Sequence, residues 1–139
     1  MTALQVPRNA VFVDTSAWVA MLDRSEASHR AVASFLREQR TLLVTSDYVV
    51  DETLTFLRLR VGAPIALRFG ESLLADDGIA FVRLSEADWK QARAIFRRYA
   101  EHDFGFTDCT SFALMKRLGL SRALTLDGHF RVMGFQVLP

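Results

Sequence analysis

The chain has 139 residues, half of them hydrophobic, and its 17 basic and 16 acidic residues leave a formal net charge of +1. This length suits one domain over residues 1–139, and the near-neutral charge says nothing about a polyanionic partner. The single cysteine, Cys109, excludes an internal disulfide framework and a thiolate zinc site. No signal peptide pattern and no apolar run of about 20 residues is present, so we expect a cytoplasmic protein without a membrane partner.

The first third of the chain predicts a strand, two helices and a second strand. Residues 10–13 (AVFV) are a short apolar, β-branched run that is typical of a fully buried strand. Residues 15–23 predict a short helix. Residues 25–39 predict a second helix, because apolar side chains recur there at helical spacing. Residues 41–45 (TLLVT) predict the next strand.

The middle of the chain predicts two helices in succession. Residues 46–60 predict a helix with Ser46 or Asp47 as its N-cap. Residues 63–75 predict another helix, in which Pro64 is tolerated because it falls in the first turn.

The last part of the chain again alternates strands with helices. Residues 79–84 predict a strand, residues 85–100 a helix capped by Ser85, and residues 107–119 a helix that Gly119 ends. The remaining elements are a loop at 101–106, a strand at 122–126, a turn or short helix at 127–134 and a short strand at 135–139. This alternation predicts an α/β fold with a mainly parallel sheet and helices on both faces.

Two acids come directly after predicted strands. Asp14 follows residues 10–13, and Asp127 follows residues 122–126. Taken alone, each is explained better by a helix cap or a turn than by a functional site. Both nevertheless lie where ligands bind in open α/β sheets, beyond the carboxyl ends of the strands.

Two further acids share helix faces with apolar residues. Glu52 lies on one face with Val49, Phe56 and Leu59, so we expect it at the edge of the buried face or directed into a site. Asp108 lies on the face of Phe112, in a first helical turn, where the helix dipole also favours an anion.

If these four carboxylates converge, they repel one another unless they are protonated or bound to a cation. Without a cysteine pair or clustered histidines, an all-oxygen site favours Mg²⁺ or Mn²⁺ over zinc. Magnesium commonly joins carboxylates to a phosphate and activates a bound water. The acids therefore point to metal-assisted hydrolysis of phosphodiester bonds.

Four segments carry a family resemblance. FVDTSAWVAMLD, TSDYVVDETLTFLRLR, FTDCTSFALMKRLG and ALTLDGHFRVMGF resemble, in order and spacing, the four acidic motifs of the PIN domain, and more narrowly those of VapC-type toxins. The resemblance covers nearly the whole chain. It implies a Rossmann-like parallel sheet, a Mg²⁺- or Mn²⁺-dependent endoribonuclease that cuts RNA, and a homodimer that a cognate antitoxin protein holds inactive.

The resemblance carries four acids over to this chain as catalytic and metal-binding residues: Asp14, Glu52, Asp108 and Asp127. It implies direct metal contact most strongly for Asp14 and Asp108, and contact through water or a role in positioning the nucleophile for Glu52. Thr15 and Ser16 match the hydroxyl pair of the first motif. They could hydrogen-bond a metal-bound water or a phosphate, or cap the helix.

Other polar residues are weaker candidates. Asp103 could be a fifth acid of the site, and His129 could meet a phosphate, whereas Cys109 is expected in the core. Surface positions are expected for His29 and His102. Four arginines near the motifs could hold an RNA backbone: Arg58, Arg60, Arg122 and Arg131.

Two alternatives to a nuclease stay open at this point. The first is a PIN-like module that binds RNA or a protein without cutting. The second is a phosphotransferase with Asp14 as a covalent nucleophile. Such enzymes often carry a second aspartate two residues later, where this chain has Ser16.

Overall fold

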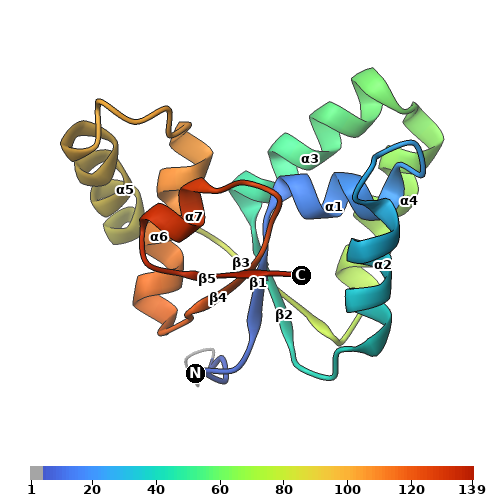
Figure 1. The fold of residues 1–139 in the computed structure, drawn as a ribbon, viewed down its shortest axis with the longest axis horizontal. Coiled ribbons are helices and arrows are strands. Elements are labelled where there is room, and N and C mark those ends of the chain that lie inside the picture. The colour runs from blue at the N-terminus through green and yellow to red at the C-terminus, as the bar shows by residue number, and fades with distance from the viewer. Residues whose placement is uncertain (1–4) are drawn as a thin grey trace.

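The computed structural model describes residues 5–139, in which five strands are connected by seven helices (Figure 1). The strands are β1 (Val11–Val13), β2 (Leu43–Ser46), β3 (Ile79–Val82), β4 (Arg122–Leu124) and β5 (Gln136–Leu138). The helices are α1 (Thr15–Leu22), α2 (His29–Glu38), α3 (Asp47–Arg60), α4 (Ala63–Ala75), α5 (Glu86–Arg98), α6 (Phe106–Leu118) and α7 (His129–Val132).

The strands form one sheet in the order β3-β2-β1-β4-β5, and every neighbouring pair is parallel. Helices α1 to α4 lie on one side of the sheet and α5 to α7 on the other (Figure 1). This arrangement confirms the predicted α/β fold with a parallel sheet covered on both faces. The sheet is buried accordingly, and β1 and β2 have no exposed residue.

The strand order places a ligand-binding position between β1 and β4. The chain runs outward from β1 to β3, returns to β4 on the other side of β1, and so reverses its direction across the sheet. Ligands in open α/β sheets bind at such a reversal, beyond the carboxyl ends of the strands. Because Val13 pairs with Leu124, the next residues along, Asp14 and Thr125, leave the sheet side by side.

The predicted helix ends are confirmed where a side chain or a glycine defines them. Ser46 Oγ accepts a hydrogen bond from the backbone N–H of Val49 (3.1 Å). Ser85 and Asp88 form a reciprocal capping box at the start of α5. Gly119 ends α6 with a φ of 72°, a left-handed conformation that glycine adopts without strain.

Helix α2 begins four residues later than the sequence predicts, at His29 instead of Ser25. The reason is local, because the Asp23 carboxylate accepts hydrogen bonds from the backbone N–H (3.0 Å) and the hydroxyl (2.6 Å) of Ser25. This side-chain turn competes with helix formation, and residues 23–28 stay a loop.

An ion pair fixes α5 against α6. Arg117 donates two hydrogen bonds to Asp88, from Nε to Oδ1 (2.7 Å) and from a terminal nitrogen to Oδ2 (2.8 Å). Helix α6 is buried over Cys109–Met115, and Asp108 lies in its first turn, directly before this buried segment.

None of the helices in residues 5–139 combines the length and apolar character that crossing a membrane requires.

Candidate active site

Asp14 lies where β1 leaves the sheet, with only 4% of its surface exposed. Its backbone N–H donates to the carbonyl of Leu124 (3.0 Å). Its carboxylate Oδ2 accepts hydrogen bonds from Thr125 Oγ1 (2.9 Å) and Ser16 Oγ (3.0 Å). Asp14 is the N-cap residue of α1, but its side chain makes no capping hydrogen bond. The helix-cap explanation of this carboxylate is therefore wrong.

Thr125 is the residue of this arrangement that sequence reasoning missed. Its hydroxyl donates to Asp14 and accepts from the backbone N–H of Asp127 (3.0 Å), while Ser16 Oγ accepts from the N–H of Leu126 (2.9 Å). The first and fourth motifs are thus joined directly. The signal in the sequence was a polar residue within the apolar run ALTL, whereas its place beside Asp14 follows from the parallel register of β1 and β4.

Asp108, Asp127 and His129 form a second group beside Asp14. His129 Nδ1 lies 3.3 Å from Asp108 Oδ2 and 3.1 Å from Asp127 Oδ1, so one imidazole N–H faces two carboxylates. Asp127 Oδ1 also accepts from the His129 backbone N–H (2.9 Å). The imidazole packs edge-on against Phe104, with ring centroids 5.0 Å apart. One ligand atom from each member of the trio lies within 4.8 Å of the others.

Glu52 reaches the same cavity from α3, as expected, but Val49 is the only buried apolar residue on its helix face. Phe56 is 37% and Leu59 is 75% exposed. The side that α3 buries is centred on Val50, Thr53 and Leu57 instead. Glu52 itself is exposed, so it needs no compensation for burial and can turn towards a ligand.

A cavity of about 400 Å³ brings the four predicted acids together. Glu26, from the loop between α1 and α2, lines it as well and was not foreseen from the sequence. No arginine or lysine is among its lining residues within the described chain. The described wall of the cavity therefore has an excess of acidic groups over arginine and lysine. Its lining also includes hydroxyls and backbone: Thr15, Ser16, Gly105 and Thr107.

The electrostatics of the cavity differ from those of ordinary surface acids. Burial raises the pKa of Asp14 above its usual value, although the hydrogen bonds from Thr125 and Ser16 oppose the rise. Burial, followed by the charges of Asp14 and Asp127, raises the pKa of Asp108 to about 6. Burial therefore disfavours the ionised forms of both carboxyls, and for Asp108 the neighbouring negative charges add to the effect.

The weaker candidates lie elsewhere. Asp103 is exposed and does not line the cavity. The cavity lining also lacks the four arginines near the motifs: Arg58, Arg60, Arg122 and Arg131. Cys109 is fully buried, as expected, and burial raises the pKa of its thiol to about 11. His102 is exposed, whereas His29 is half-buried and its Nδ1 donates to the Ala20 carbonyl (2.8 Å).

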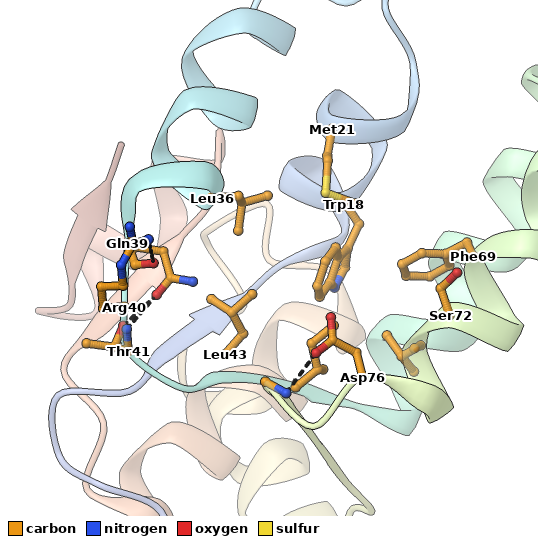
Figure 2. Close-up of a pocket in the computed structure, with 13 residues that line it drawn as sticks. Trp18, Met21, Leu36, Gln39, Arg40, Thr41, Leu43, Phe69, Ser72 and Asp76 are labelled. Atoms are coloured by element: carbon orange, nitrogen blue, oxygen red, sulfur yellow. Dashed lines mark hydrogen bonds between the residues drawn. The ribbon is translucent and has the colours of Figure 1, made fainter.

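Another cavity, of about 440 Å³, lies between α1, α2 and α4 and contains none of the predicted acids. Figure 2 shows Trp18, Leu43 and Phe69 pointing towards its centre, with Gln39 and Thr41 at one edge. Its only acid among the described residues is Asp76, whose Oδ1 accepts a hydrogen bond from the backbone N–H of Gly78 (2.7 Å), so it has no group of carboxylates for metal-assisted hydrolysis. The acidic cavity is therefore the candidate active site.

The family model of the PIN domain matches residues 11–136. The chain belongs to the PIN domain family. This match spans all four acidic motifs of the PIN domain that the sequence predicts. Whether residues 1–139 are one domain stays a prediction.

Two relatives narrow the family. The chain is 30% identical over 130 residues to the 23S rRNA-specific endonuclease VapC20 of Mycobacterium tuberculosis, covering 90% of this chain and 95% of the relative. It is 31% identical over 124 residues to ribonuclease VapC26 of the same organism, covering 88% and 91%. This PIN domain chain therefore belongs to the VapC-type endoribonuclease toxins. The predicted family and enzyme class are confirmed.

Solved structures agree with this assignment. The crystal structure of VapC20, described as a sarcin-ricin loop cleaving toxin, matches with a TM-score of 0.87 and 30% identity, over 93% of this chain and 99% of that one. FitAcB from Neisseria gonorrhoeae matches with a TM-score of 0.68 and 17% identity, over 93% and 96%. At that identity, the second match shows a shared fold alone.

Proposed function

We propose that this VapC-type protein cuts RNA with a Mg²⁺ or Mn²⁺ ion held by Asp14, Asp108, Asp127 and Glu52. The observation that carries the proposal is the convergence of these acids in one cavity that, within residues 5–139, no arginine or lysine lines. The raised pKa of Asp108, to about 6, supports a site that accepts a cation more readily than a further anion.

The residues present suit a hard divalent cation. The carboxylates offer oxygen ligands, which Mg²⁺ and Mn²⁺ prefer. Thr15 Oγ1 is buried against the cavity and has no hydrogen-bond partner within residues 5–139. An unpaired buried hydroxyl is costly, so it supports a bound water or ion beside Thr15. In this proposal, Asp14 and Asp108 are the principal ligands.

When bound, the cation supplies an activated water and neutralises charge on the phosphate. The protein positions the groups around it. Thr125 and Ser16 hold Asp14 Oδ2, and His129 holds one oxygen each of Asp108 and Asp127, so three carboxylates are oriented before substrate arrives. Glu52, exposed at the mouth, is placed to orient the attacking water or to contact the ion through water.

The substrate and partners follow from the relatives, as proposals. VapC20 is named for cleavage of 23S rRNA, so we propose a structured RNA of this kind as the substrate. We further propose an antitoxin protein partner, since VapBC2 from Rickettsia felis, which shares the fold, was solved as a VapBC complex. The homodimer is proposed from the resemblance to VapC-type toxins alone. Because the proposed substrate is RNA, we expect the protein to act in the cytoplasm.

The test is cleavage of purified 23S rRNA by the isolated protein, with product ends mapped by primer extension. We expect discrete cuts with Mg²⁺ and none with EDTA. Asp14→Asn and Asp108→Asn should each abolish cleavage while the circular dichroism spectrum stays unchanged. Asp103→Asn is the matched control, because Asp103 is an exposed acid outside the cavity. Cleavage of any tested RNA by a pure Asp14→Asn protein at the wild-type rate would refute the proposal.

The same experiment separates the alternatives. A binding-only module would retain RNA but leave it uncut under every metal condition. A phosphotransferase would retain a phosphoryl group on Asp14, which mass spectrometry of the acid-quenched protein would detect. The structure gives no support to that chemistry, because Asp14 is 4% exposed and one of its oxygens is held by two hydroxyls.

A further inference from the structure

A groove on the outer side of α2 is lined by basic side chains. Its volume is about 540 Å³. Its walls are Arg24, His29, Arg30, Ala33, Ser34 and Arg37. Three of these residues are arginines and none is an acid. Because the whole chain has a net charge of only +1, the groove is a local concentration of positive charge.

The arginines of this basic groove are available to a ligand. Arg30, Ser34 and Arg37 follow helical spacing, and the two arginines are exposed on one face of α2. Arg37 donates to Ser34 Oγ (3.1 Å), but no groove arginine forms an ion pair within residues 5–139. Arg40, in contrast, is occupied by backbone carbonyls at the end of α2.

The basic groove adjoins the acidic cavity. Arg24 lines the groove and Glu26 lines the cavity, and both belong to the loop between α1 and α2 (Figure 1). Because Arg24 and Glu26 are two positions apart in the chain, their Cα atoms lie at most about 7 Å from each other. The loop between them is held by Asp23, whose carboxylate accepts two hydrogen bonds from Ser25. Opposite charges therefore lie on the two sides of one short, braced loop.

We infer that the basic groove binds the sugar–phosphate backbone of the RNA substrate beside the phosphate that is cut. The inference rests on the proposed function. Guanidinium groups bind phosphate oxygens through two N–H donors, and a row of them on one helix face suits a chain of phosphates. Ala33 is the only apolar residue of the lining, so the groove offers nothing to an apolar side chain. These contacts position the RNA without reading its sequence.

The experiment measures RNA binding as a function of salt. Full-length protein carrying Asp14→Asn, which leaves the RNA intact, is titrated with a fluorescent single-stranded RNA at several KCl concentrations. Each phosphate contact contributes about 0.7 to the slope of log K against log salt. The double variant Arg30→Ala/Arg37→Ala should lower that slope by about 1.4. Arg93→Ala, an exposed arginine on α5 at the other end of the molecule, should leave it unchanged (Figure 1).

Kinetics on the otherwise wild-type protein provide a second readout. In the double alanine variant KM should rise several-fold and kcat should change less, because the groove contacts the RNA outside the reacting centre. Arg30→Lys/Arg37→Lys keeps the charges and should retain the wild-type salt slope. Both positions are exposed, so melting curves should stay within a degree or two of wild type.

Three results would overturn the inference. An unchanged salt slope in the double alanine variant, while the wild type still cuts RNA, would refute the groove and leave the proposed function intact. Failure of the wild type to bind or cut any RNA would refute both. Polyglutamate serves as a probe for an acidic protein partner. If the double alanine variant lost binding to polyglutamate but bound RNA as the wild type does, the groove would be assigned to such a partner instead.

Discussion

Replacing Asp108 with asparagine should stabilise the metal-free protein while it destroys activity. Burial, followed by the negative charges of Asp14 and Asp127, raises the pKa of Asp108 from 3.8 to about 6. A raised carboxyl pKa means that the ionised form is disfavoured by folding, so folding pays a penalty at neutral pH. Asparagine has nearly the same shape and removes the charge.

The size of the effect follows from the pKa. One pKa unit corresponds to about 1.4 kcal/mol, so a rise of about two units sets a ceiling of about 3 kcal/mol. The Asp108 side chain is 17% exposed, and solvent screens part of the repulsion. We therefore expect a gain of about 1–2 kcal/mol in the free energy of unfolding. The penalty is complete above pH 6, shrinks as the pH falls through 6, and vanishes below pH 3.8.

Urea unfolding in EDTA measures this difference directly. At pH 7.5, Asp108→Asn should be more stable than wild type, and at pH 5 the gap should narrow. Excess Mn²⁺ should reverse the order, because ligand binding stabilises only the protein that holds the ion. Asp103→Asn, which removes an exposed charge, should change neither value by more than about 0.5 kcal/mol. An Asp108→Asn protein no more stable than wild type at pH 7.5 would refute the reasoning.

Three further predictions concern residues around the site and in the core. Thr125→Val should weaken Mn²⁺ binding about 10- to 100-fold by calorimetry, because Asp14 loses a hydrogen bond, and Thr125→Ser should restore it. Arg117→Ala should cost about 1–3 kcal/mol in urea unfolding, since it leaves Asp88 buried and unpaired. Because the pKa of Asp88 is lowered, the stability from this pair should persist at neutral pH and be lost as the pH falls below 3.8. Native Cys109 should resist iodoacetamide at pH 8 and react once urea unfolds the protein, as mass spectrometry would show.

The sequence was sufficient for the elements and their order, because short β-branched runs alternate with helical spacing and three helix ends have clear signals at Ser46, Ser85 and Gly119. It was less reliable where a side chain competes with the backbone. The Asp23 turn delays α2 to His29, and nothing in the apolar spacing of residues 25–39 indicates that delay.

The acids were predicted individually, whereas their arrangement needed the third dimension. The Glu52 helix face looked apolar because of Val49, Phe56 and Leu59, yet Val49 is buried whereas Phe56 and Leu59 are exposed to solvent. Thr125 gained its importance only through the parallel register that brings it beside Asp14. Residues distant in sequence form such contacts, so one motif read alone could not reveal them.

The central claim is that the converging acids hold the divalent ion that cleavage requires. Calorimetric titration of Mn²⁺ into the wild-type protein, Asp14→Asn and Asp103→Asn tests it most directly. We predict that wild type and Asp103→Asn bind Mn²⁺ equally, with a dissociation constant matching the Mn²⁺ concentration for half-maximal cleavage, and that Asp14→Asn binds at least tenfold more weakly. Equal Mn²⁺ binding by wild type and Asp14→Asn would contradict the account.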